Sequence, residues 1–223
     1  MKVFRLLFVS QAALLAIFSG AAAGADGTDN SARSVLPPYS KQALQSKIEY
    51  CQTCHGGLAE GVRGAFPIPR LAGQQIKYME NQLRNFVVHK RQNNVMSNAV
   101  QQMGSAEMTA LASYFYDLNP KPLGGAPKGL EATGKKIFEE GLPEADVPAC
   151  MSCHGPEAKG AGAFPRLAGQ LDDYISRKLV NWEKDRGQAQ AAPGGPAATM
   201  KSVAHRLTDT QMAAVAAYLS YLE

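Results

Sequence analysis

The sequence predicts an all-α fold, arranged as two tandem copies of one small domain. A Cys-x-x-Cys-His-Gly phrase at residues 51–56 recurs at residues 150–155, and a Pro-Arg-Leu-Ala-Gly-Gln phrase at 69–74 recurs at 165–170. Apolar residues elsewhere follow helical spacing, and no run of residues is typical of a β-strand. A period of about 100 residues is too long for a solenoid repeat, so each period is expected to be a whole domain.

Residues 1–25 are expected to form a secretory signal peptide. Lys2 and Arg5 give a positive start, an apolar run follows, and small residues precede Asp26. The alternative is a membrane anchor, but the apolar run is short for a bilayer span. We therefore expect an exported protein with no transmembrane segment in the mature chain.

Composition places the domain boundary near residue 120. Residues 121–127 are rich in Pro and Gly, which cannot continue a helix, and are predicted to be a linker. The first domain is then residues 26–120 and the second is residues 128–223.

Each domain should contain a leading helix, a Gly/Pro-rich loop, a middle helix, a second loop and a final helix. The predicted helices span residues 41–50, 75–88 and 105–118 in the first domain, and 129–140, 171–184 and 208–222 in the second. The final helices carry Glu107 and Asp209 near their starts, where negative charge suits the helix dipole. The loop before the last helix is longer in the second domain, where residues 187–199 are rich in Ala, Gly and Pro.

The four cysteines form two Cys-x-x-Cys-His motifs, and each motif predicts one covalently attached haem c. Cys51 and Cys54 would form thioethers with the two vinyl groups of one porphyrin, and Cys150 and Cys153 would do so with those of a second. A thioredoxin-type motif would explain the cysteines but not the histidine, and it occurs in a βαβ context. A zinc site is disfavoured because the two pairs belong to separate domain copies.

In each motif the histidine, His55 or His154, is the predicted axial ligand of the iron. A methionine thioether is the other ligand typical of electron-transfer haems. Met96 and Met200 are the candidates because they occupy matching repeat positions and precede similar phrases. Three other methionines in this region are interpreted as core residues: Met103, Met108 and Met212. His205 is a rival to Met200.

An axial histidine needs an acceptor for its second ring nitrogen, which fixes its orientation and basicity. Pro69 and Pro165, in the loops after the motifs, are candidates to present a backbone carbonyl there, with Pro67 as a rival to Pro69. The repeated tyrosines are interpreted as packing residues, with a hydrogen bond to a haem propionate as the alternative: Tyr78, Tyr174, Tyr114 and Tyr218.

The motifs, the Arg-Leu-Ala-Gly-Gln phrases and the late methionines together resemble the two-haem class I cytochromes c, and more narrowly the cytochrome c4 group. The resemblance covers nearly all of residues 40–223. It implies two class I cytochrome c domains, each wrapped around one haem, with the haems close enough to exchange electrons. It also implies a periplasmic or membrane-surface role, relaying electrons toward a terminal oxidase or another reductase.

The expected function is electron transfer between redox proteins of a respiratory chain, in the periplasm. The net charge is only +4, and nucleic-acid binding usually needs a clustered basic face, so nucleic acid is not an expected partner. The alternative is a haem enzyme or an electron-accepting subunit of a dehydrogenase, of the di-haem peroxidase or thiosulfate-oxidising type. An enzyme needs an exchangeable iron position, which two methionine-capped haems lack.

Overall fold

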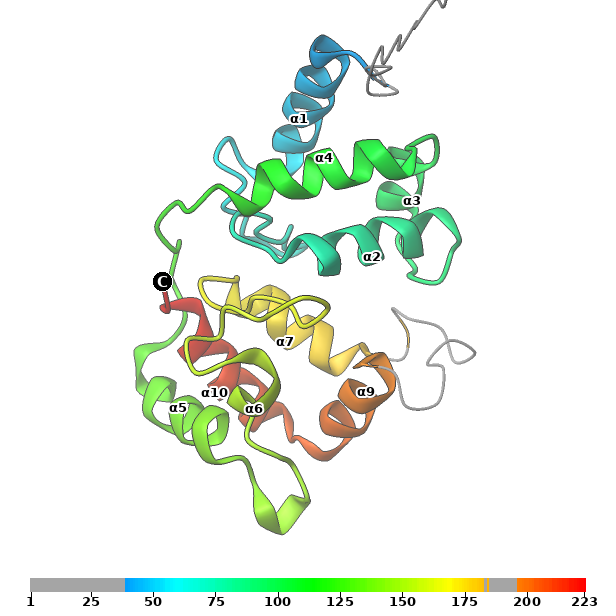
Figure 1. Ribbon diagram of the computed structural model, residues 1–223. Coiled ribbons are helices and arrows are strands. Elements are labelled where there is room, and N and C mark those ends of the chain that lie inside the picture. Colours follow the sequence, from blue (N-terminus) through cyan, green and yellow to red (C-terminus); the bar gives the residue numbers. More distant parts are fainter. Residues whose placement is uncertain (1–38, 183, 185–195) are drawn as a thin grey trace, which may run out of the picture. The chain divides into compact units, whose positions relative to one another are not determined.

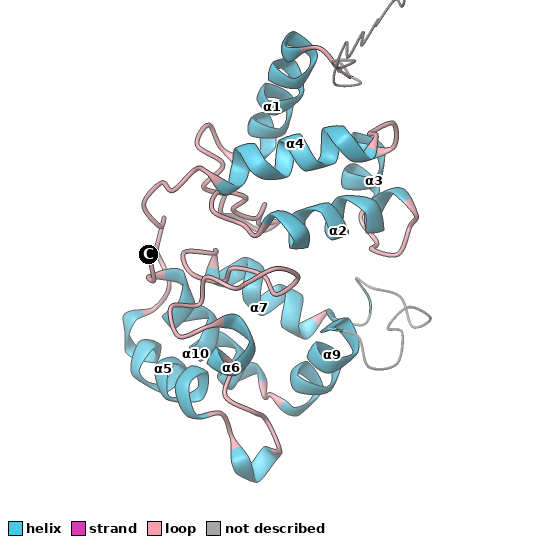
Figure 2. Cartoon of the chain, viewed as in Figure 1, coloured by secondary structure: helices cyan, strands magenta, loops and turns pink. Residues whose placement is uncertain are grey.

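The computed structural model describes residues 39–182, 184 and 196–223. The predicted signal peptide, residues 1–25, lies outside the described residues, as does most of the long loop before the last helix. Residues Leu36–Glu223 belong to one compact unit that includes both halves of the repeat. The described part of the chain is helical, with three isolated β-bridges and no strand (Figure 2). This confirms the predicted all-α class.

The described residues of the first half contain four helices (Figure 1): α1 Lys41–His55, α2 Ile76–Val87, α3 Asn94–Val100 and α4 Ser105–Tyr116. Helix α1 begins because the Ser40 hydroxyl accepts a hydrogen bond from the Ala43 amide at 3.0 Å. Unlike the predicted helix, α1 continues past Tyr50 and through the whole cysteine motif. Gly56 ends it at φ 93°, a conformation that a side chain would strain.

The second half repeats this order with one interruption. Its described elements are η1 Lys128–Leu130, α5 Glu131–Glu140, η2 Pro143–Ala145, α6 Met151–His154, α7 Asp172–Val180, α9 Pro196–Arg206 and α10 Asp209–Ser220. A short loop closed by a bridge between Leu142 and Val147 separates the leading helix from the motif, which forms the short helix α6. The motif of the second half is therefore not an extension of its leading helix.

Two segments predicted as loops are helical. Helix α3 starts at a side-chain cap, since the Asn93 carboxamide oxygen accepts from the Met96 amide at 3.0 Å. Helix α9 begins at Pro196, a residue favoured in the first helical turn, so residues 196–199 are helix and not loop. Both candidate methionine ligands therefore lie on helices.

Each half has its own apolar core. Phe86, Leu111 and Phe115 are among the buried residues of the first, and Phe138, Val215 and Leu219 among those of the second. No helix of the described residues is long and apolar enough to cross a membrane. Residues 117–127, between α4 and η1, contain no helix.

The contact between α5 and α10 leaves no room for a side chain at Gly134. A Cβ atom there would lie 1.9 Å from the carbonyl oxygen of Ala214. Although alanine favours a helix more than glycine does, the two backbones would have to separate. We expect Gly134→Ala to lower the stability of the haem-loaded protein by about 1–3 kcal/mol, measured as a lower midpoint of thermal unfolding.

Gly129→Ala is the matched control, because a Cβ atom at Gly129 meets nothing within 4 Å. Its midpoint should stay close to that of the wild type. Equal midpoints for the two variants would contradict this account of the α5–α10 contact.

Candidate functional site

The first motif occupies the last turns of α1. Residues three and four apart on a helix share a face, so Cys51, Cys54 and His55 project from one side of the helix end. Cys54 is exposed, Cys51 is partly buried and His55 is 6% exposed. Burial raises the pKa of the Cys51 thiol to about 11, so it is a neutral thiol at neutral pH.

The second motif has a similar arrangement, with Cys150 at the N-cap of α6 and Cys153 and His154 within it. Cys153 is exposed, Cys150 is partly buried, and His154 is 5% exposed. Burial also raises the pKa of the Cys150 thiol to about 11. None of the four cysteines forms a disulfide. Both halves therefore present two unpaired thiols beside one buried imidazole.

A proline carbonyl meets each motif histidine. His55 Nδ1 lies 2.8 Å from the Pro69 oxygen, and His154 Nδ1 lies 3.0 Å from the Pro165 oxygen. Because a carbonyl only accepts, Nδ1 carries the proton and Nε2 keeps a lone pair for a metal. Burial lowers the pKa of both histidines, more than the carbonyl contacts raise it, which favours the neutral imidazole.

The proline loops are held by backbone bonds at both ends. The carbonyl of Ala59, just after the first motif, accepts from the amides of Leu71 and Ala72 at 2.9 and 3.0 Å. At the other end the Gly73 amide donates to Phe115 of α4 at 2.8 Å. The second half repeats these bonds with Ala158 and Gly169. The repeated phrase is thus fixed between the motif and the final helix.

The candidate methionines are both partly buried. Met96 lies on α3 and packs against the first core, and Met200 lies on α9. The methionines interpreted as core residues are indeed buried in the cores: Met103, Met108 and Met212. Coordination of iron by Met96 and Met200 stays a prediction.

Among the repeated tyrosines, Tyr114 and Tyr218 pack against the two cores. The Tyr174 hydroxyl instead accepts a hydrogen bond from Arg91 at 2.7 Å. Arg91 itself is buried and also donates to Gln82 at 3.0 Å. Sequence reasoning did not single out Arg91.

Two glutamines that close the repeated phrase were also missed as functional candidates. Gln74 and Gln170 are buried, and each reaches the backbone of the other half. Gln170 bonds the amide and carbonyl of Arg70 at 2.8 and 3.0 Å, and Gln74 bonds those of Arg166 at 2.8 and 3.1 Å. The repeat itself was a signal that could have identified them, because the local structure of a Gly-rich loop does not require a glutamine at the same position in both copies.

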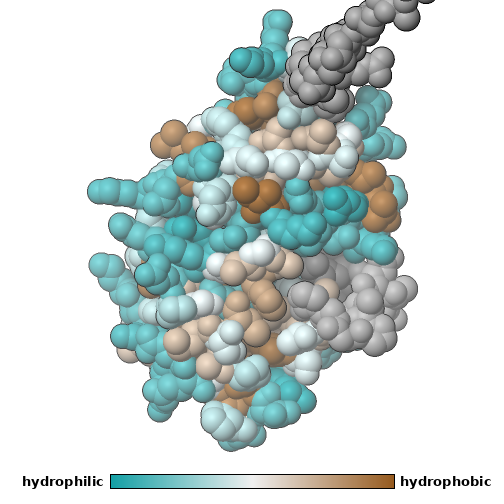
Figure 3. Space-filling view, in the orientation of Figure 1, coloured by the Kyte–Doolittle hydropathy of each residue, from teal (hydrophilic) through white to brown (hydrophobic). Residues whose placement is uncertain are grey.

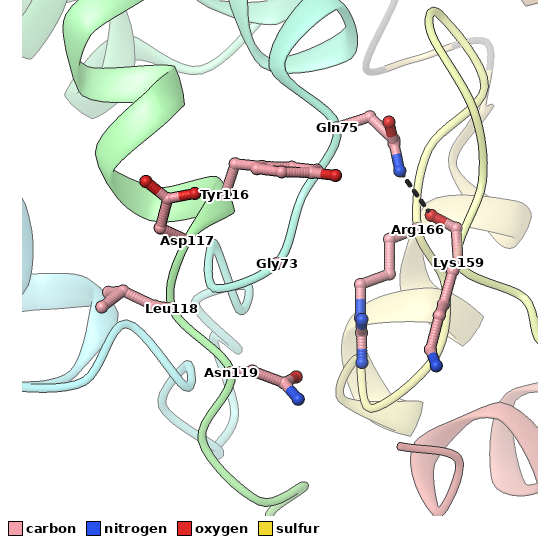
Figure 4. A pocket seen from close by; sticks show the side chains of 8 residues that line it. All are labelled: Gly73, Gln75, Tyr116, Asp117, Leu118, Asn119, Lys159 and Arg166. Atoms are coloured by element: carbon pink, nitrogen blue, oxygen red, sulfur yellow. Dashed lines mark hydrogen bonds between the residues drawn. The ribbon is translucent and has the colours of Figure 1, made fainter.

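A pocket of about 260 Å³ lies beside these contacts (Figure 4). Gln75, Tyr116, Asn119, Lys159 and Arg166 are among its lining residues, and the Gln75 amide reaches the Lys159 carbonyl at 2.9 Å. The lining contains neither cysteine nor histidine, so this pocket is distinct from the two motif sites.

The comparisons with known proteins agree with these two sites. A family model described as "Cytochrome c" matches residues 131–223, and one described as "Cytochrome C oxidase, cbb3-type, subunit III" matches residues 41–115. The chain is 38% identical to the thiosulfate dehydrogenase electron acceptor of Thiomonas intermedia, over 82% of this chain and 83% of that protein. It is 37% identical to cytochrome c4 of Thiocapsa roseopersicina, over 88% of this chain and 98% of that protein.

The solved structure of Acidithiobacillus ferrooxidans cytochrome c4 superposes with a TM-score of 0.67 and 38% identity, covering 78% of this chain and 99% of that one. Two helical domains of the class I cytochrome c type, each with its haem motif, define a di-haem c-type cytochrome with two covalently bound haem c groups. Its work is electron transfer. Within that class, the chain belongs to the cytochrome c4 family.

The described residues fit this cofactor. Each half offers two free thiols and an imidazole whose Nε2 is available. In addition, Arg70 Nη1 and Arg166 Nη2 are buried without a hydrogen-bond partner among the described residues. Such buried cationic groups suit an anionic ligand, and haem carries carboxylates. Bound haem iron supplies one-electron chemistry between its ferrous and ferric states.

Each cysteine pair should hold its haem independently. We expect the double variant Cys51→Ala and Cys54→Ala to retain one covalent haem, because the second motif lies in a separate half with its own core. Intact mass and a haem stain after denaturation measure this. Thr53→Ala, between the two cysteines, is the control and should retain both haems; a double variant that also keeps two would contradict the assignment.

Proposed function

We propose that the chain carries electrons in the periplasm between redox proteins of a respiratory chain, through two His/Met-ligated haems. The buried His55 and His154, each with Nδ1 held by a proline carbonyl, are the observation that carries the proposal. Each iron would take one of these histidines and a methionine, Met96 in the first half and Met200 in the second. Residues 1–25 would direct export, and the domains would be residues 26–120 and 128–223, joined by 121–127.

Electron exchange requires a haem edge near the surface. The second cysteine of each motif, Cys54 or Cys153, is exposed, and Leu58 just after the first motif is 60% exposed. Figure 3 shows apolar side chains interspersed with hydrophilic ones on one face of the molecule. This mixture suits a carrier that must bind a partner protein and then release it.

Met96→Ala and Met200→Ala should each remove one low-spin His/Met haem from the spectrum and lower the potential of that haem, because a thioether ligand raises it. Optical spectroscopy and a redox titration measure both effects.

Met103→Leu is the matched control, since Met103 is buried and corresponds in the repeat to the buried Leu207. It should leave both haems low-spin. His205→Ala should do the same. Loss of a signal in His205→Ala, with none in Met200→Ala, would exchange the ligand assignment of the second haem.

A second candidate function is electron acceptance from a thiosulfate-oxidising enzyme. The relative from Thiomonas intermedia, named a thiosulfate dehydrogenase electron acceptor, favours it. With catalytic amounts of a purified thiosulfate dehydrogenase and excess thiosulfate, the ferric haems of this chain should be reduced, seen as growth of the reduced α-band. Reduction by thiosulfate alone would instead indicate that the chain itself oxidises thiosulfate. If the haems stay ferric with and without the dehydrogenase, the chain is neither the electron acceptor of that enzyme nor a thiosulfate-oxidising enzyme.

A further inference from the structure

One peptide group in each half is hydrogen-bonded on both sides. The peptide that joins Pro69 to Arg70 places its carbonyl oxygen 2.8 Å from His55 Nδ1. Its N–H, on Arg70, donates to Gln170 Oε1 at 2.8 Å. A chain of two hydrogen bonds thus runs from the imidazole of the first half, through a single peptide group, to a side chain of the second half.

The other half contains the reciprocal chain. The peptide that joins Pro165 to Arg166 places its carbonyl oxygen 3.0 Å from His154 Nδ1. Its N–H, on Arg166, donates to Gln74 Oε1 at 2.8 Å. Gln74 and Gln170 occupy matching positions of the repeat, so each half contributes the equivalent glutamine to the peptide group of the other half.

The glutamine amides are fixed in this orientation. Gln170 Oε1 also accepts from the Leu171 amide at 3.1 Å, and Gln170 Nε2 donates to the Arg70 carbonyl at 3.0 Å. Gln74 makes the corresponding bonds to Gln75 and Arg166. A flipped amide would set its NH₂ group against two N–H donors, so the oxygen must face the peptide.

We propose that each half tunes the haem of the other: Gln170 acts on the iron held by His55, and Gln74 acts on the iron held by His154. The proposal rests on the proposed axial role of the two histidines. Gln74 and Gln170 are positioning residues, because each acts on a histidine through one peptide group.

The direction of the effect follows from polarisation. A hydrogen-bond acceptor at the N–H of a peptide group polarises that group. The polarisation places more negative charge on the carbonyl oxygen of the same group and makes that oxygen a stronger acceptor. A stronger acceptor at Nδ1–H makes the imidazole a more basic ligand, which favours the ferric state. The glutamine of one half therefore lowers the potential of the haem in the other half.

The experiment compares opposite substitutions in the holoprotein. Gln170→Met removes the acceptor at similar side-chain size, and should raise the potential of the His55 haem more than that of the His154 haem. Gln170→Glu keeps Oε1 as a stronger acceptor and should lower it. The same pair at Gln74 should shift the His154 haem. Redox titration gives the potentials, with each haem identified through the Met96→Ala and Met200→Ala spectra.

Gln75→Met is the control. It removes the cross-half bonds from the Gln75 side chain to the Lys159 and Gly160 carbonyls but leaves both doubly bonded peptides intact. Its two potentials should stay near those of the wild type. If contacts between the halves matter only for packing, Gln75→Met and Gln170→Met should shift the potentials alike, which would overturn the proposal.

A second readout follows the bond itself. In the reduced, diamagnetic protein, the NMR signal of the His55 Nδ1 proton should move upfield in Gln170→Met and stay in place in Gln74→Met. Three outcomes of the redox titration would refute the crossed effect. In a glutamine→Met variant, only the potential of the haem in the same half could change, both potentials could change equally, or neither could change. The axial-ligand assignment is tested separately, by the low-spin spectra of the wild type and of the methionine variants. Only glutamine variants that keep two low-spin haems are used to test the crossed effect.

Discussion

Each motif histidine depends on a single hydrogen bond from its Nδ1 to a proline carbonyl. A buried imidazole without that partner would lose both its orientation and the solvation of its N–H. The surrounding structure keeps the carbonyl in place. In each half, the carbonyl of Ala59 or Ala158 accepts hydrogen bonds from two backbone amides of the proline loop. The amide of Gly73 or Gly169 then donates to a carbonyl of the final helix. The leading helices and cores support these loops in turn.

Much of this arrangement was predictable because it rests on covalent and local constraints. The Cys-x-x-Cys-His spacing is dictated by one porphyrin, so the cofactor and its attachment follow from the two cysteines and the histidine of each motif. The helical class follows from apolar spacing along α4 and α10. The proline carbonyls could be proposed because an axial histidine needs an acceptor and few residues lie in a position to offer one.

Other features depend on contacts that no local pattern reveals. The sequence predicts loops around Met96 and Met200 where the structure has helices, although Asn93 and Pro196 are recognisable helix starts once the helices are known. The exchange of Gln74 and Gln170 was hidden for a different reason. Repetition marks a residue as structurally constrained, but it does not say which copy of the domain its side chain contacts.

The exchanged glutamines make the contact between the halves isologous: the same residue on each side binds the same phrase on the other. Contacts of this kind are those of two-fold homodimers, and two unlinked copies of a single-haem domain have all the groups needed to form one. Joining the copies in one chain replaces a concentration-dependent association by an intramolecular one. A few hydrogen bonds then suffice to pair the domains at any protein concentration, and each copy becomes free to diverge on its outer surface while the shared phrase stays fixed.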